Sequence, residues 1–188
     1  MAKNFRGKNF LKLIDFSSQD IRYLLEMAKN FKSMKRAGVP HRYLEGKNIV
    51  LLFEKTSTRT RCSFEVAGAD LGMGVTYLDP AGSQMGHKES IKDTARVLGR
   101  YYDAIVCRTY KQTTLDMLAK YSGIPVISGM TDYAHPLQVL TDLMTVRERK
   151  GTLAGLKAGF VGDGYNMANS VIVGCLAMGM AVTAACPK

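Results

Sequence analysis

The sequence predicts an α/β protein with a mainly parallel, open sheet that has helices on both faces. Short apolar runs rich in Val, Ile and Leu alternate along the chain with stretches whose apolar residues recur at helical spacing. Since parallel strands need a crossover connection, this alternation favours a parallel sheet. Hydrophobic residues make up 46% of the 188 positions, which is enough for a buried core.

The expected elements follow in order. The first helix begins near Ser17, where Asp20 completes a capping box, and Gly38 marks its end. Four strands are expected, at 48–53, 75–78, 103–107 and 124–127. Helices are expected over 62–72, with the preceding polar residues in the first turn, then over 90–101 and 115–121, and finally from 134–138 to Val146.

Near residue 150 the pattern starts again. A strand is expected at 158–162, its turn at 163–170, a helix at 171–180 and a last strand at 181–186. We therefore divide the chain into a first domain, 1–149, and an incomplete second domain, 150–188. One β-α-β unit cannot close a core by itself, so it either docks on the first domain or begins a longer protein.

The charge and the cysteine content bear on which partners and which cell compartment the sequence favours. The net charge of +10 is scattered, and its densest group, residues 29–36, lies on the outer face of an amphipathic helix. A solvated face and one anion site explain this better than a nucleic-acid partner. No apolar run reaches the roughly 18 residues of a membrane span, and no signal peptide is present. Free thiols without metal-ligand spacing indicate a cytoplasmic protein; they are Cys62, Cys107, Cys175 and Cys186.

A polar stretch, FEKTSTRTR at 53–61, separates the first strand from the following helix. Residues 57–60 therefore sit at a helix start, where backbone N–H groups lack partners and the dipole is positive. These N–H groups, the hydroxyls and the guanidinium groups of Arg59 and Arg61 are the donors that a phosphate dianion needs. The stretch predicts an anion cradle. The plain alternative is a capping hydroxyl with solvated arginines.

More polar groups are expected at the same edge of the sheet, because ligands of open α/β sheets bind beyond the carboxyl ends of the strands. Arg108 directly follows the third strand, Gln84 lies in the loop after the second, and His135 and Gln138 stand at a helix start. The last two face one side and suit polarisation of a carbonyl or carbamoyl oxygen. A surface Arg108 and a backbone-bonded His135 are the plain alternatives.

Several motifs resemble those of the aspartate/ornithine carbamoyltransferase family. STRTR at 57–61 is similar to the carbamoyl-phosphate signature of that family, and HPLQ at 135–138 to its second motif. SQMGHKESIKDT at 83–94 is similar to the ornithine branch more than to the aspartate branch. GDGYNMANS at 162–170 looks like the ornithine-side turn that opens the second domain. The resemblance covers essentially the whole chain.

The resemblance implies roles for the candidate residues in binding carbamoyl phosphate. The phosphate would be held by Ser57, Thr58, Arg59 and Thr60. The carbamoyl group and its bridging oxygen would be bound by the catalytic residues Arg108, His135 and Gln138. These donors would stabilise the charge that develops as an amine attacks.

The resemblance also implies partners and a reaction. Gln84 would reach the active site of a neighbouring subunit in a homotrimer or a higher assembly of trimers, and Asn166 would contact L-ornithine. The ornithine δ-amine would attack carbamoyl phosphate, giving L-citrulline and phosphate, a reaction of arginine biosynthesis. No metal or organic cofactor is implied, because phosphate is a good leaving group and catalysis rests on positioning and charge stabilisation.

Family members continue well past Lys188, so we expect an incomplete form that lacks most of the amine site. Three alternatives to carbamoyl transfer to ornithine remain open. The amine could instead be aspartate, putrescine or an acylated ornithine, or the chain could be a non-enzymatic anion-binding or assembly fragment. A nucleic-acid binder ranks last, because aromatic and basic residues are not interleaved on a strand face.

Overall fold

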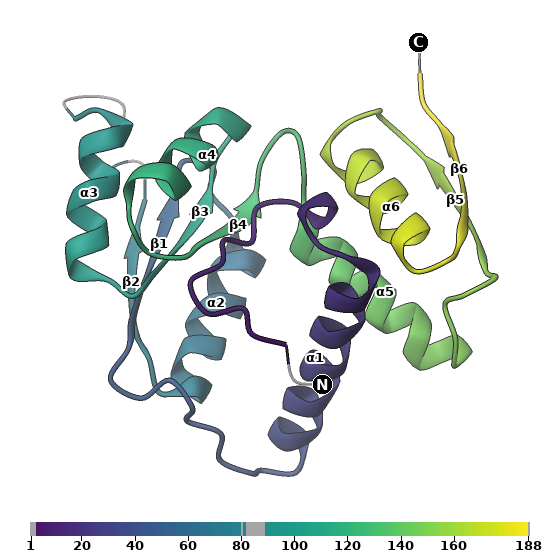
Figure 1. Ribbon diagram of the computed structural model, residues 1–188, viewed down its shortest axis with the longest axis horizontal. Coiled ribbons are helices and arrows are strands. Elements are labelled where there is room, and N and C mark those ends of the chain that lie inside the picture. Colours follow the sequence, from purple (N-terminus) through teal and green to yellow (C-terminus); the bar gives the residue numbers. More distant parts are fainter. Residues whose placement is uncertain (1–2, 80, 82–88, 188) are drawn as a thin grey trace.

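The computed structural model describes residues 3–79, 81 and 89–187, and a four-stranded sheet lies at its centre (Figure 1). All pairings in this sheet are parallel, and the spatial order is β2-β1-β3-β4. The predicted parallel α/β fold is therefore confirmed. The strands are β1 (Asn48–Phe53), β2 (Gly74–Leu78), β3 (Ala104–Arg108) and β4 (Val126–Met130).

Helices cover both faces of this sheet because its central strands are apolar on both sides. Alternate residues of β1 separate into two cores, Val50 and Leu52 facing one way and Leu51 and Phe53 the other. The first core packs on α3 (Ile91–Tyr101) and α4 (Gln112–Tyr121). The second packs on α2 (Thr58–Leu71), whose Phe64 contacts it.

The N-terminal segment protects the β4 edge of the sheet. The N–H of Phe10 donates to the Val126 carbonyl at 2.8 Å, and the N–H of Ser128 donates to the Phe10 carbonyl at 2.8 Å. An exposed strand edge is a template for unwanted pairing, and these bonds remove part of it. A short 3-10 helix, Leu13–Asp15, follows. Neither feature was predicted, because the segment has no apolar periodicity.

The first long helix, α1 (Ser18–Arg36), has the ends that its sequence predicted. Ser17 Oγ accepts from the N–H of Asp20 at 3.2 Å, and the Asp20 carboxylate accepts from the N–H of Ser17 at 3.1 Å. The predicted capping box is therefore present, and two N–H groups of the helix start have partners. At the other end Gly38 has a φ of +66°, a left-handed conformation that favours glycine.

The second β-α-β unit docks on the first domain through a long helix, α5 (Pro136–Lys150). Its own helix packs so closely that a Cβ at Gly174 would lie 2.5 Å from Val139 Cγ1. Val139 and Leu143 of α5 share one buried cluster with Ile21 of α1 and Cys175 of the second unit. The unit consists of β5 (Lys157–Val161), α6 (Asn166–Ala177) and β6 (Ala181–Ala185), with β5 and β6 parallel.

The start of α6 corrects one prediction. A helix was expected over 171–180 after a turn at 163–170, but α6 begins at Asn166 and ends at Ala177. The first turn of α6 mixes two asparagines with Met167 and Ala168, so its apolar periodicity is weak. Asn166 and Ser170 are nevertheless buried, because they contact the segment before α5 rather than solvent.

No helix in the described part of the chain is long and apolar enough to cross a membrane. Within 3–79, 81 and 89–187, no group of three or more His, Cys, Asp or Glu side chains is placed to hold a metal ion. The four cysteines are free thiols, with Cys107 and Cys175 buried.

Candidate active site

The candidate residues meet where the strand order reverses. From β1 the chain crosses to β2 on one side, and it later returns to β3 on the other side of β1. The loops that leave β1 and β3 therefore diverge at the carboxyl ends of these strands, which is the place where open α/β sheets bind ligands. Phe53 pairs with Arg108 at this point, so the polar stretch after β1 and the end of β3 are neighbours.

Ser57 is the N-cap of α2, as the plain alternative expected, but this does not exclude an anion site. Ser57 Oγ accepts from the N–H of Thr60 at 3.2 Å and donates to Thr60 Oγ1 at 3.1 Å. These bonds fix the first turn of the helix. The N–H groups of Thr58 and Arg59 precede the first intrahelical bonds and remain available as donors. The first turn of α2 can therefore hold a phosphate.

The two arginines of this stretch have different environments. Arg61 Nε donates to Glu65 at 2.9 Å, and its guanidinium lies over the Tyr77 ring, 3.8 Å from the ring centroid. Arg59 is exposed, and its charge acts on Arg108. Arg61 therefore already has partners within the protein, and its expected contribution to the anion cradle stays a prediction. The structure brings Arg108 to the side of Arg59.

Arg108 is only partly satisfied by the protein. Its Nη1 lies 3.5 Å from both Thr60 Oγ1 and the Gly129 carbonyl, which is the outer limit of a hydrogen bond, and its buried Nε has no partner. Burial and the neighbouring Arg59 lower the pKa of Arg108. A buried donor without a partner, next to a second positive charge, is a position that an anion would stabilise.

The backbone around Arg108 is irregular. The pairing of β3 with β4 shifts between Cys107 and Arg108, so that Arg108 lies opposite Met130. Met130 has a φ of +152°, the one positive value at a non-glycine residue in the described chain. Such irregularities re-aim side chains, and strained backbone gathers at functional sites. Both features lie where Arg108 leaves the sheet.

His135 completes the described cluster. It is the N-cap of α5, and its Nδ1 is buried without a hydrogen-bond partner. Burial first, and then the charge of Arg108, lower the pKa of His135 to about 4. The imidazole is therefore neutral near pH 7 and can offer one N–H to a polar ligand.

Gln138 and Gln84 are not placed in this cluster by the structure. The amide of Gln138 is exposed and donates to Asp142 at 2.9 Å along α5, so it does not aim at one point with His135. Gln84 lies outside the described residues. The described cluster therefore consists of the α2 start, Arg108 and His135.

The start of α6 is joined to the segment that carries His135. Asn166 Nδ2 donates to the Thr131 carbonyl at 2.7 Å, and Ser170 Oγ accepts from the N–H of His135 at 2.8 Å. Asn169 Nδ2 donates to the Tyr133 carbonyl at 3.0 Å. We call these three bonds the α6 latch. They place Asn166 beside the cluster with its amide nitrogen already bonded.

Sequence reasoning missed a second tie between the loops at the β1 and β3 ends. The buried hydroxyl of Thr109 donates to the Glu54 carboxylate, which joins the residues that directly follow the two strands. Lys55 Nζ lies 5.3 Å from the centroid of the Tyr110 ring. The signal was available, because polar residues directly after adjacent parallel strands are expected to meet.

Comparisons with known proteins agree with this geometry. Residues 8–148 match the family model described as aspartate/ornithine carbamoyltransferase, carbamoyl-P binding domain. This chain belongs to the aspartate/ornithine carbamoyltransferase family. The resemblance stated from the motifs, 57–61 and 135–138 among them, is thereby confirmed.

Individual relatives carry the ornithine name. A Treponema denticola protein named catabolic ornithine carbamoyltransferase is 66% identical over 188 residues, which are all of this chain and 56% of that protein. The structure of ornithine carbamoyltransferase from Pyrococcus furiosus has a TM-score of 0.97 and 46% identity, covering 99% of this chain and 59% of that one. An anabolic ornithine carbamoyltransferase from Campylobacter jejuni has a TM-score of 0.88 and 38% identity, over 96% of this chain and 58% of that one. This chain thus spans somewhat under two thirds of each of these proteins.

Proposed function

We propose that the first domain binds carbamoyl phosphate and that the whole protein transfers its carbamoyl group to the δ-amine of L-ornithine. The observation that carries the proposal is the buried, unpartnered Arg108 Nε beside Arg59 and the start of α2. Two guanidinium groups and a helix N-terminus suit the phosphate dianion. The family match over 8–148 supports the same ligand.

The proposed roles follow from the positions of the donors. Ser57, Thr58, Arg59 and Thr60 would bind the phosphate, with Ser57 also fixing the helix start. Arg108 and the neutral His135 would bind the carbamoyl group and the oxygen that bridges it to the phosphate, where negative charge develops as the amine attacks. Gln138 and Gln84 stay in the proposal on the motif resemblance. Gln138 would have to leave Asp142 when the ligand binds.

Calorimetric titration with carbamoyl phosphate tests the phosphate assignment. Arg59→Ala should weaken binding at least about tenfold, because hydrogen bonds to charged groups contribute about 1.5–3 kcal/mol. Arg61→Ala is the matched control, since Arg61 lies two residues later but is bound to Glu65 and Tyr77. Equal losses in the two variants, or unchanged binding in Arg59→Ala, would refute the cradle.

The choice of L-ornithine as the amine substrate is supported by the names of the relatives and by Asn166 at the start of α6. The Asn166 amide nitrogen is bonded to Thr131, which leaves its carbonyl oxygen to accept from the ammonium group of an amino acid. Citrulline formation from radiolabelled carbamoyl phosphate, compared with the products from putrescine and aspartate, tests this choice. Carbamoyl-aspartate as the main product would contradict it.

Three further statements remain predictions. The division at 149/150 is supported by the end of the family match at residue 148 and by the change of sheet after α5. A trimer rests on the motif resemblance, and light scattering tests it. The motif resemblance implied a role in arginine biosynthesis, whereas the Treponema denticola relative is named a catabolic enzyme. Comparing the rates of citrulline synthesis and phosphorolysis decides between the two directions.

A further inference from the structure

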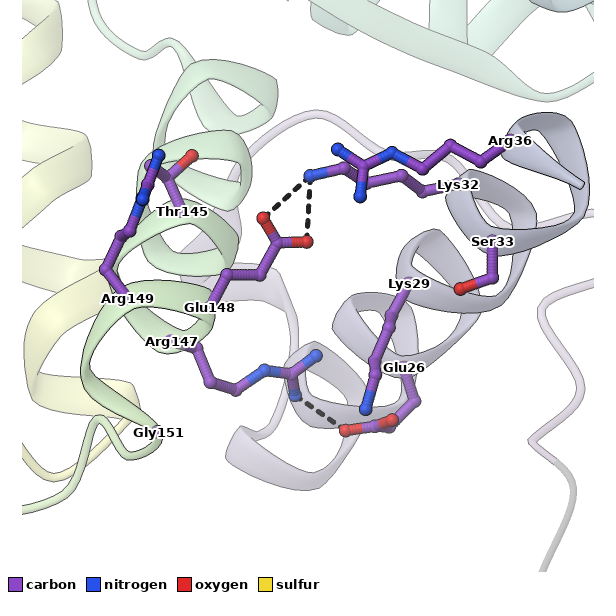
Figure 2. Close-up of a pocket in the computed structure, with 10 residues that line it drawn as sticks. All are labelled: Glu26, Lys29, Lys32, Ser33, Arg36, Thr145, Arg147, Glu148, Arg149 and Gly151. Atoms are coloured by element: carbon purple, nitrogen blue, oxygen red, sulfur yellow. Dashed lines mark hydrogen bonds and ion pairs between the residues drawn. The ribbon is translucent and has the colours of Figure 1, made fainter.

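A positively charged concavity lies between α1 and α5, outside the candidate active site (Figure 2). It is an open groove of about 930 Å³. Five basic side chains and two carboxylates line it, together with the hydroxyls of Ser33 and Thr145. The basic residues are Lys29, Lys32, Arg36, Arg147 and Arg149, and the acidic ones are Glu26 and Glu148. We call this the α1/α5 groove.

Two of its cations are already paired. Arg147 Nη1 lies 2.7 Å from Glu26, and Lys32 Nζ lies 2.7 and 2.8 Å from the two oxygens of Glu148 (Figure 2). Arg147 also donates to the Leu25 carbonyl at 3.2 Å. These bonds hold α5 on α1 and fix the walls of the groove.

Three cations remain without a carboxylate. Within the described ranges, none of Lys29, Arg36 and Arg149 has a carboxylate oxygen within 4.0 Å. The charges of Arg36 and Arg149 act on the same carboxylate, because both help to lower the pKa of Glu148 after the larger effect of Lys32. Lys29 lines the same groove. An excess of positive charge in a concave surface raises the local concentration of anions.

Cations at the ends of helices have an ordinary explanation, since they stabilise the negative end of the helix dipole. That explanation covers Arg36 and Arg149, which lie in the last turns of α1 and α5. It does not explain Lys29, which lies two turns before the end of α1, or why the unpaired cations share one groove.

We propose that the α1/α5 groove is a binding site for a polyphosphate anion. Three unpaired cations match the charge of a triphosphate better than that of a single phosphate, and the Ser33 hydroxyl can donate to one of its oxygens. The Thr145 hydroxyl is not counted here, because it donates to the Thr141 carbonyl at 2.8 Å. None of the described residues that line the groove is aromatic, so nothing there stacks on a nucleobase. Inorganic triphosphate and ATP should therefore bind with similar affinity. His135 and Arg149 lie at opposite ends of α5, which separates the groove from the candidate active site by about 20 Å.

Calorimetry with inorganic tripolyphosphate, ATP and inorganic phosphate tests this site at about 0.15 M salt, where long-range attraction is screened. The measurements use the full chain carrying Arg59→Ala, which disables the proposed cradle. We expect saturable tripolyphosphate binding, ATP affinity within a few-fold, and weaker binding of phosphate. If the wild type does not bind carbamoyl phosphate, the proposed function is refuted, but the outcome of the tripolyphosphate titration still decides the proposal for the α1/α5 groove.

Substitutions of the three unpaired cations test whether the anion binds in the α1/α5 groove. Combining Lys29→Gln, Arg36→Gln and Arg149→Gln should weaken tripolyphosphate binding at least about tenfold, because charged hydrogen bonds are lost. The control combines Arg100→Gln and Lys120→Gln, which remove cations from the last turns of α3 and α4 and should leave binding unchanged.

One further variant distinguishes binding in the α1/α5 groove from unspecific attraction by the net charge of the protein. Glu148→Gln removes a carboxylate and releases Lys32, so it should tighten binding several-fold. Equal losses in the triple variant and in its control would overturn the proposal, as would an absence of saturable binding. Tighter binding of a single-stranded DNA oligonucleotide than of tripolyphosphate would overturn it too, by assigning the groove to nucleic acid.

Discussion

At the scale of single residues, the charge state of His135 distinguishes the candidate site from a plain surface. Its folded pKa of about 4 lies below the ordinary value of 6.5, because burial and Arg108 disfavour the cation. Between these values the unfolded chain binds the proton more readily than the folded chain. The free energy of unfolding should therefore fall as the pH falls through this window, with the contribution fully present above pH 6.5.

An NMR titration of the imidazole signals measures this pKa directly. The chain has three histidines, and a His135→Gln variant identifies the signal of His135. We expect it to stay neutral down to about pH 4. A midpoint near 6.5 would contradict the buried environment beside Arg108.

Residue types alone could identify most residues of the candidate site, but not the directions in which their side chains point. Arg108 and His135 follow from the rule that ligands bind beyond the carboxyl ends of parallel strands. Arg59 and Arg61 cannot be distinguished by that rule, because both lie in the first turn of α2. Glu65, four residues after Arg61, was the available signal, since an acid and a base at that spacing pair on a helix.

At the scale of elements, the α6 latch connects the second unit to His135. Ser170→Ala removes the acceptor of the His135 N–H, which should speed hydrogen exchange at that amide and weaken carbamoyl phosphate binding. Ser170→Thr keeps the hydroxyl and should restore both. Asn169→Ala is the control, because Asn169 bonds to Tyr133 rather than to His135.

Unchanged exchange at the His135 amide in Ser170→Ala would show that the latch does not position this residue. A loss of thermal stability without a change in exchange or affinity would assign Ser170 a packing role only. Restoration by Ser170→Thr separates these cases, because threonine retains the acceptor oxygen.

The contact between α3 and α4 depends on one glycine. A Cβ at Gly99 would overlap the backbone carbonyl of Ser122, a position that cannot be relieved by turning a side chain. Gly99→Ala should therefore lower the free energy of unfolding by about 1–3 kcal/mol, as overpacking does. Gly159→Ala is the matched control, since a Cβ there meets nothing within 4 Å.

Denaturant unfolding compares these two alanine variants. Equal stability of Gly99→Ala and the wild type would contradict the close approach of α3 to Ser122.

Strands were predicted better than helix starts, for a physical reason. The expected strand 48–53 coincides with β1, since a strand buried on both faces is apolar at every position. Helix α6 was placed five residues late, at 171 rather than Asn166, because its first turn uses polar groups for contacts with the segment before α5. Periodicity detects burial of apolar groups and misses burial of bonded polar ones.

At the scale of the whole molecule, the second unit docks on the first domain, and the chain also spans only 56% of the Treponema denticola relative. A single β-α-β unit cannot close a core, and α6 instead shares buried residues with α5 and α1. The basic residues behind the net charge of +10 are likewise divided between the candidate active site, the α1/α5 groove and the solvated surface. Charge alone could not locate either region.

Backbone amide shifts during a carbamoyl phosphate titration would show where on the chain the anion binds. We expect saturable shifts at residues 57–60, 108 and 135, where the N-terminus of α2 and the ends of β3 and β4 meet. Amides at 29–36 and 145–149, in the α1/α5 groove, should not shift at the same concentrations. Shifts in the groove without shifts at 57–60 would contradict the claim that this family member holds carbamoyl phosphate at the carboxyl ends of β1 and β3.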